Sequence, residues 1–145
     1  MAPCAPVGLL AFADIAVGQK YGAGERMDAA AMDVFQSLSG DTNPLHTDVV
    51  AARLQGFPDR TVYGFLMLSL LSRIVGTHFQ NAVCAALSVD FSHPAFCDDP
   101  VTVEAEITHV QAPMRSAVLK FRISTPVAVA ARGKLTIKFL AGGVS

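Results

Sequence analysis

The sequence lacks a cluster of basic residues, and this absence argues against nucleic acid as a partner. Its 145 residues include 11 Lys and Arg and 12 Asp and Glu, which give a formal net charge of −1. Because these cations are scattered along the chain, they form no basic stretch that would follow a phosphate backbone. The length of 145 residues suits one domain rather than two.

Paired cysteines, a membrane-spanning run and a recognisable leader are also missing. The three cysteines form no Cys-x-x-Cys pair and leave one odd thiol, so a secreted disulfide framework is not expected. The longest apolar run, residues 65–75, contains an arginine and two serines and is shorter than the about 20 residues that span a bilayer. Residues 1–10 are apolar but follow no basic residue, which makes a poor signal peptide. We expect a cytoplasmic protein with no membrane segment and a loosely ordered tail over residues 1–11.

Apolar residues, in contrast, are abundant. They make up 52% of the chain, and the mean hydropathy is +0.43. Such a composition predicts that some apolar surface is buried against another subunit, and we expect a homo-oligomer.

The most informative stretch is Ser-Gly-Asp-Thr-Asn-Pro-Leu-His-Thr-Asp, residues 39–48. It separates an acid, Asp41, from an imidazole, His46, by a sequence that disfavours a continuous helix, because the residue before a proline avoids the α conformation. We therefore expect the two side chains to converge across a bend. An acid and an imidazole so placed suit proton transfer to and from water.

Two early helices are predicted on either side of this stretch. Residues 29–38 are good helix formers, with Asp28 as N-cap and Gly40 as the stop. A shorter helix is predicted over residues 49–54, with Thr47 and Asp48 as its cap and first turn.

The rest of the chain predicts an antiparallel sheet around one helix. Residues 64–75 form a helix that is apolar on nearly every side, so something must enclose it. Alternating apolar and polar residues predict four later strands, within residues 82–91, 101–108, 117–123 and 135–139. Early helices, late strands and no βαβ alternation indicate an α+β fold.

Residues 39–48 resemble the hydratase signature of the MaoC-like (R)-specific enoyl-CoA hydratases and dehydratases. The likeness continues in residues 61–66 and 69–72, and extends more loosely from residue 12 to residue 139. It implies a hot-dog fold, an antiparallel sheet wrapped around a long central helix, with residues 12–145 as its single domain. It also implies a homodimer in which the sheets of two subunits join edge to edge.

The resemblance further implies a hydro-lyase that interconverts trans-2-enoyl and (R)-3-hydroxyacyl thioesters. No cofactor is expected beyond the carrier on the substrate, which is coenzyme A or acyl carrier protein. Two alternatives stay open: a hot-dog acyl thioesterase, and a non-catalytic acyl-binding or partner subunit.

In the implied mechanism Asp41 and His46 hold one water, with Asp41 as the base and His46 orienting the water and sharing the proton transfer. The N–H of Gly64, at a helix start, is the expected donor to the thioester oxygen, and the missing Cβ lets the acyl group approach. Tight helix packing is the alternative reason for this glycine.

Three further expectations concern supporting groups. Ser72 matches a serine whose hydroxyl would hold Asp41, although hydrogen bonding within its own helix is equally compatible with the sequence. Asn43 is expected to brace the loop. A metal bound by Asp41, His46 and Asp48 is not expected, because no recognisable ligand set accompanies them.

Tyr63 departs from the resemblance, since the family usually has histidine before this glycine. A phenol with a pKa of about 10 is a poor proton donor near neutrality. We therefore expect Tyr63 to be a tolerated variant of the helix entry rather than a catalytic acid.

Overall fold

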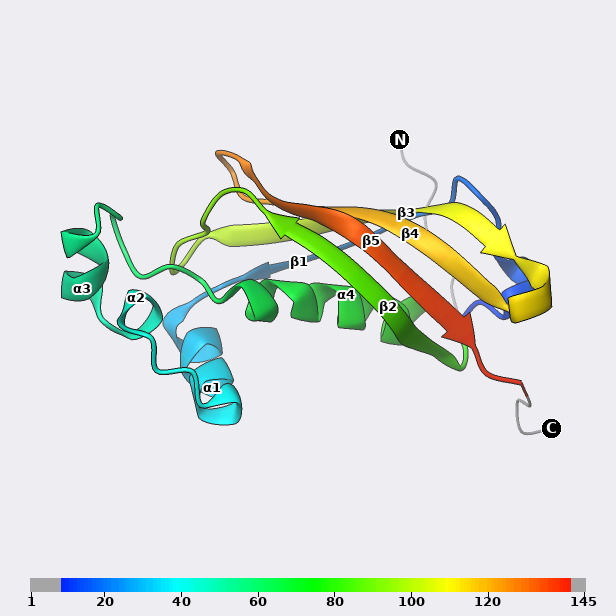
Figure 1. Ribbon diagram of the computed structural model, residues 1–145, viewed down its shortest axis with the longest axis horizontal. Helices are drawn as coiled ribbons and strands as arrows, with labels where there is room; N and C mark the ends of the chain where they lie inside the picture. The colour runs from blue at the N-terminus through cyan, green and yellow to red at the C-terminus, as the bar shows by residue number, and fades with distance from the viewer. Residues whose placement is uncertain (1–8, 142–145) are drawn as a thin grey trace.

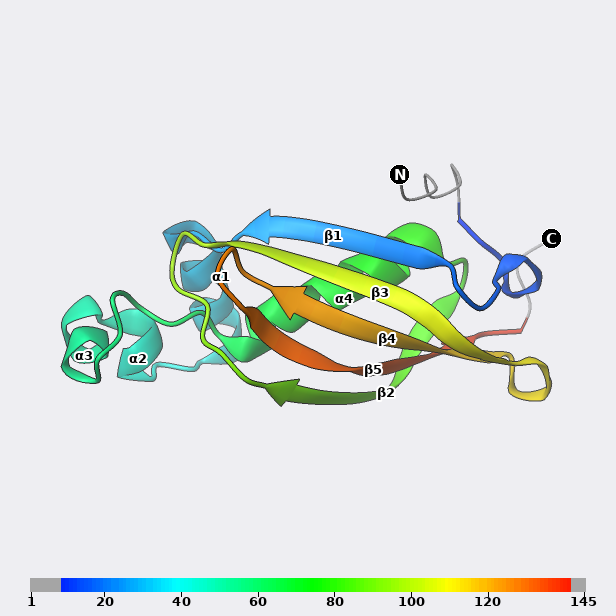
Figure 2. The same cartoon turned by 90° about the horizontal axis from the view of Figure 1, so that it is seen from above.

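The computed structural model describes residues 9–141, which form a five-stranded antiparallel sheet packed on one long helix (Figure 1). The strands lie side by side in the order β1-β3-β4-β5-β2, so β1 and β2 form the two edges (Figure 2). The strands are β1 (Lys20–Arg26), β2 (Ala82–Phe91), β3 (Pro100–Gln111), β4 (Ser116–Ser124) and β5 (Val129–Phe139). The helices are α1 (Ala29–Ser39), α2 (Pro44–Thr47), α3 (Val49–Leu54) and α4 (Gly64–His78), with short 3-10 turns at Phe12–Asp14 and Ala112–Met114.

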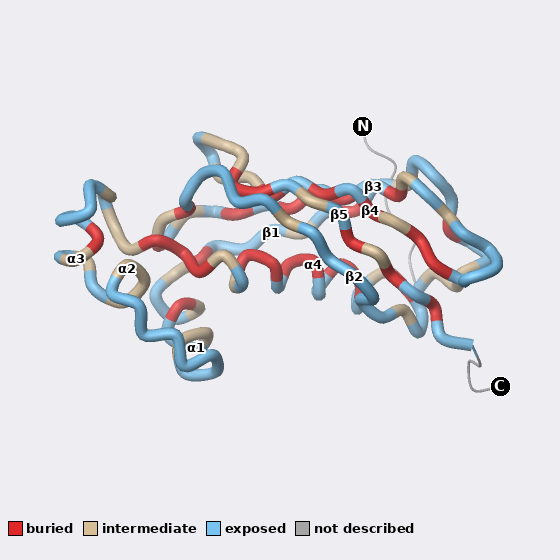
Figure 3. The backbone as a smooth tube through the Cα atoms, in the orientation of Figure 1, coloured by how far each residue is buried: buried red, intermediate tan, exposed pale blue. Residues whose placement is uncertain are grey.

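The core lies between the sheet and α4. Alternate residues of β3 and β4 are buried, as are the residues of α4 that face the sheet (Figure 3). The main buried side chains of the helix are Met67, Leu68, Leu70, Leu71, Ile74 and Val75. The predicted α+β arrangement, an antiparallel sheet wrapped around a long helix, is confirmed.

The early helices begin and end as the sequence predicts. The side chain of Asp28 accepts the N–H of Ala31 at 2.9 Å and caps α1. Gly40, with φ +72°, ends that helix in the left-handed region where glycine carries no steric penalty. The cap of α3 is Asp48, one residue later than the predicted Thr47, and its side chain accepts the N–H of Val50 at 2.8 Å. The helices α1, α2 and α3 lie at the same end of the sheet as the start of α4 (Figure 1).

One strand was missed by the sequence analysis. Strand β1 pairs with β3 over residues 20–26, although its sequence, Lys-Tyr-Gly-Ala-Gly-Glu-Arg, contains two glycines. Glycine is depleted in strands, and this segment shows no apolar alternation, so local preference gives no signal. The pairing comes instead from the free edge of β3. The expected four strands are therefore five.

The enclosure expected for α4 is incomplete in one chain. Its inner side packs on the sheet, but Phe65 is 75% exposed and Ser72 and Arg73 also face outward. The expectation that β2 is half-buried is wrong, because every one of its residues is exposed or only partly covered (Figure 3). The helix side and the β2 edge therefore leave apolar surface uncovered in the single chain.

Most of the tail expected over residues 1–11 lies outside the described residues. Within the described part, Leu10 forms a parallel bridge with Phe79, and its N–H donates to the carbonyl of His78 at 2.8 Å. No helix between residues 9 and 141 is long and apolar enough to cross a membrane.

Candidate active site

The turn that carries Asp41 is built from its own side chains. The carboxylate oxygen Oδ1 of Asp41 accepts the N–H of Asn43 at 3.0 Å. The side chain of Asn43 in turn accepts the N–H of Leu45 at 3.0 Å and caps α2, whose first residue is Pro44. Asp41 thus precedes a helical turn that contains His46, and the structure places Asn43 in the bracing position expected for it.

The imidazole of His46 is held by Thr61. Its Nδ1 lies 2.7 Å from the carbonyl oxygen of Thr61 and 3.1 Å from the Thr61 hydroxyl. A carbonyl only accepts, so Nδ1 carries the hydrogen, and the neutral ring keeps Nε2 as its acceptor. The N–H of Thr61 donates to the carbonyl of Leu45 at 2.9 Å, which ties α2 to the segment leading into α4.

Tyr63 contacts both predicted catalytic residues. Its hydroxyl donates to the main-chain carbonyl of Asp41 at 2.9 Å, and its ring stacks on His46 with centroids 4.2 Å apart. Tyr63 is 2% exposed, whereas Asp41 is exposed and His46 half-buried. Burial and then the charge of Asp41 raise the pKa of the Tyr63 phenol. The structure therefore brings Asp41 and His46 to one buried side chain.

Gly64 follows Tyr63 as the first residue of α4, which is 15 residues long. The first N–H of a helix has no partner within that helix and lies at the positive end of its dipole. A Cβ placed on Gly64 would lie 2.9 Å from the ring of Phe91, so side-chain packing also favours glycine here. The packing alternative therefore has a contact behind it, and the role of the Gly64 N–H stays a prediction.

The hydrogen bond expected from Ser72 to Asp41 is absent among the described residues, 9–141. Ser72 lies nine residues beyond Tyr63 on α4, and no hydrogen bond of its hydroxyl is present among residues 9–141. It lines an apolar groove of about 360 Å³ between α4 and β2. Ser69, one turn earlier, donates to the carbonyl of Leu66 at 2.6 Å. The alternative of hydrogen bonding within the helix thus applies to Ser69.

Thr61 was missed by the sequence analysis. It opens the stretch 61–66 that resembles the family. Its contact with the imidazole is made by a main-chain carbonyl, which every residue type has, so the sequence does not reveal it. In the part of the chain that is described, no group of three or more His, Cys, Asp or Glu side chains is placed to hold a metal ion.

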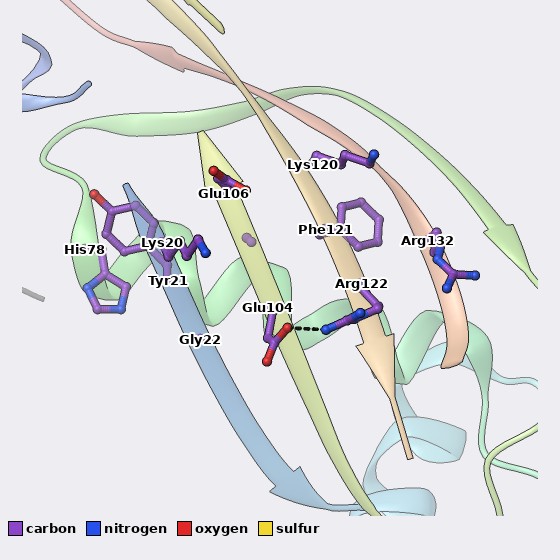
Figure 4. A pocket seen from close by; sticks show the side chains of 11 residues that line it. Lys20, Tyr21, Gly22, His78, Glu104, Glu106, Lys120, Phe121, Arg122 and Arg132 are labelled. Atoms are coloured by element: carbon purple, nitrogen blue, oxygen red, sulfur yellow. Dashed lines mark hydrogen bonds and ion pairs between the residues drawn. The ribbon is translucent and has the colours of Figure 1, made fainter. Parts of the chain in front are cut away.

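A broad hollow of about 810 Å³ lies elsewhere, against the sheet (Figure 4). Its polar lining comes from neighbouring strands, where Glu104 accepts a close hydrogen bond from Arg122. Lys20 and Glu106 lie beside this pair, and none of the predicted catalytic residues borders the hollow. The hollow is therefore separate from the turn and the start of α4, where the catalytic residues are predicted.

Comparison with known proteins decides the family. The family described as MaoC like domain matches residues 13–128. The chain belongs to this MaoC-like family. It is 35% identical over 125 residues to an (R)-specific enoyl-CoA hydratase of Aeromonas caviae, an alignment that covers 84% of this chain and 93% of that protein.

Solved structures of MaoC-like proteins agree with the fold. An (R)-hydratase from A. caviae involved in PHA biosynthesis superposes with a TM-score of 0.83 at 34% identity, covering 88% of this chain and 98% of that one. An R-hydratase of Pseudomonas aeruginosa gives a TM-score of 0.82 at 24% identity, covering 88% and 80%, and this match shows the fold alone. The predicted hot-dog fold is confirmed.

Proposed function

We propose that this protein is a hydro-lyase that adds water to trans-2-enoyl thioesters and, in reverse, removes it from (R)-3-hydroxyacyl thioesters. The A. caviae relative is named an (R)-specific enoyl-CoA hydratase. An Arabidopsis thaliana relative, 32% identical over 60% of this chain and 52% of its own length, is named a mitochondrial 3-hydroxyacyl-[acyl-carrier-protein] dehydratase. The observation that carries the proposal is that Tyr63 contacts both Asp41 and His46.

In the proposed reaction Asp41 and His46 bind one water molecule. The Asp41 carboxylate takes a proton from this water, and Nε2 of His46 orients it, because Nδ1 is already engaged by Thr61. A lone pair of the water oxygen forms the bond to C3 of the substrate. The electrons of the C2–C3 double bond move toward the thioester oxygen. A proton returned by Asp41 and His46, which we call the dyad, then forms the C2–H bond.

The negative charge on the thioester oxygen needs a donor as it develops. The N–H of Gly64 is our candidate, since it is the first of α4 and lies beside the residue that holds the dyad. Enoyl and hydroxyacyl forms differ by one water, so the reaction needs no redox change. We therefore propose no cofactor beyond the substrate's carrier, coenzyme A or acyl carrier protein.

A second copy of the chain is proposed to cover the β2 edge. Val83, Leu87 and Phe91 of this edge strand are 42 to 48% exposed, and Phe65 of α4 is 75% exposed. Exposed apolar residues along a long unpaired edge favour pairing with another strand. Joining two β2 strands edge to edge would form an isologous homodimer and close the exposed side of α4.

Incubation with a short trans-2-enoyl-CoA tests the function. We expect the conjugated-enoyl absorbance to fall without release of free thiol. Free thiol would indicate a thioesterase, and binding without either change would indicate an acyl-binding subunit. Either of these two results would contradict the proposal.

The configuration at C3 provides an independent test. We expect an (R)-3-hydroxyacyl product, which a dehydrogenase specific for the (S) form would leave unoxidised. A predominantly (S) product would show that the substrate lies across the dyad with the opposite face toward the water.

A further inference from the structure

The two tyrosines of the chain occupy similar interiors with different neighbours. Tyr21 is 6% exposed, and its hydroxyl donates to the side chain of Gln19 at 3.0 Å. Tyr63 is 2% exposed, and its hydroxyl donates to the main chain at Asp41 at 2.9 Å. Each hydroxyl has one internal acceptor, but only that of Tyr63 lies at the proposed site. Tyr21 is therefore a matched control for Tyr63.

The hydroxyl of Tyr63 fixes the chain from which the Asp41 carboxylate projects. Asp41 is exposed. Its carboxylate oxygen Oδ1 accepts a hydrogen bond from the N–H of Asn43, two residues later in the chain. The bond from Tyr63 adds a distant anchor, because it reaches 22 residues along the chain from the start of α4. Without that anchor, the nearest long-range hydrogen bonds to the turn would be those that join Leu45 and His46 to Thr61.

The ring of Tyr63 restrains the imidazole of His46. The two rings stack with an interplanar angle of 28° and centroids 4.2 Å apart. Phe35 of α1 also contacts the Tyr63 ring, with centroids 4.8 Å apart. Packed against both Phe35 and His46, the Tyr63 ring cannot move without displacing one of them.

We propose that Tyr63 is a positioning residue for hydration, whose hydroxyl holds Asp41 and whose ring holds His46 so that both meet one water. This inference rests on the proposed function. It also replaces the expectation from the sequence that Tyr63 is a tolerated variant of the helix entry. Its raised pKa, caused by burial and by Asp41, keeps the hydroxyl protonated as a donor.

Two variants separate positioning from a general effect on stability. Tyr63→Phe keeps the ring and removes the bond to Asp41, so kcat should fall by about tenfold to a hundredfold, with KM little changed. Tyr21→Phe removes the hydrogen bond from the Tyr21 hydroxyl to Gln19. We expect this variant to keep the kcat of the unmodified protein. Thermal unfolding of both variants shows whether they lose similar stability.

A second readout does not depend on turnover. In NMR spectra the amide of Asn43, which donates to Asp41, should shift in Tyr63→Phe and stay in place in Tyr21→Phe. The ring protons of His46 should keep the shift caused by stacking in Tyr63→Phe and lose it in Tyr63→Leu. The chain has four histidines, and His46→Ala identifies the relevant signals.

The positioning role is overturned if Tyr63→Phe keeps the original kcat, or if the Asn43 amide does not move. It is also overturned if Tyr21→Phe loses kcat as severely. If the unmodified protein hydrates no enoyl thioester, the proposed function fails instead. The NMR measurements then still decide whether Tyr63 holds Asp41 and His46.

Discussion

The Nδ1 atom of His46 lies 2.7 Å from the carbonyl oxygen of Thr61. This contact determines which nitrogen of the ring can act on water, because a carbonyl accepts a hydrogen bond and never donates one. With the hydrogen on Nδ1, the lone pair of the neutral imidazole is on Nε2. The main chain before α4 thus selects the tautomer that the proposed reaction needs.

His46→Asn separates the structural contact from the chemistry. The asparagine amide offers a donor to the Thr61 carbonyl but has no counterpart of Nε2. We expect hydration to fall by about 10² to 10⁴, while the melting temperature falls less than in His46→Ala, which also loses a hydrogen bond of about 1 kcal/mol. Turnover and thermal unfolding of both variants check this. Near-normal turnover in His46→Asn would show that Nε2 has no role.

The β2 edge predicts the oligomeric state. Sedimentation should show about twice the chain mass of 15.3 kDa, and Leu87→Glu should shift the protein to monomers because it places a charge in the proposed interface. Val127→Glu is the control, since Val127 is 87% exposed and lies in the turn between β4 and β5 rather than on β2. A well-folded monomer at every micromolar concentration would contradict the homodimer.

His78 predicts how stability depends on pH. Burial lowers the pKa of this imidazole, so the folded state binds a proton less readily than the unfolded chain, whose histidine pKa is about 6.5. The contribution of His78 to stability is therefore complete above that value and is lost as the pH falls through it. Urea midpoints between about pH 8 and pH 5 should fall less in His78→Gln than in the original protein. His93→Gln, at an exposed histidine, should keep the original slope, and equal slopes in all three proteins would contradict the account.

The fold was predicted well where the sequence alternates between apolar and polar residues or has a helix-capping residue. The alternation in β3 and the capping of α1 by Asp28 are confirmed, as are the α+β class and the family. Strand β1 was missed because its pairing is set by a distant edge rather than by its own residues. The exposure of β2 was missed for the same reason, since burial depends on tertiary neighbours.

The candidate site could be predicted in part. The spacing of Asp41 and His46 around Asn43-Pro44 indicates a bend, and the structure has it. The roles of Thr61 and Tyr63 could not be read from the sequence, because they depend on hydrogen bonds between residues 15 and 22 positions apart and on the stacking of Tyr63 on His46. The position of Ser72 in the groove between α4 and β2 was equally beyond local patterns.

The central claim is that Asp41 and His46 act as one unit on one water, and a double-mutant cycle tests it most directly. Asp41→Asn keeps an acceptor for the N–H of Asn43 while removing the charge, and His46→Ala removes the imidazole. Each should reduce turnover by about 10² to 10⁴, and the double variant should be scarcely slower than the slower single variant. Either single variant with near-normal hydration and unchanged melting temperature, or losses that multiply in the double variant, would contradict the account.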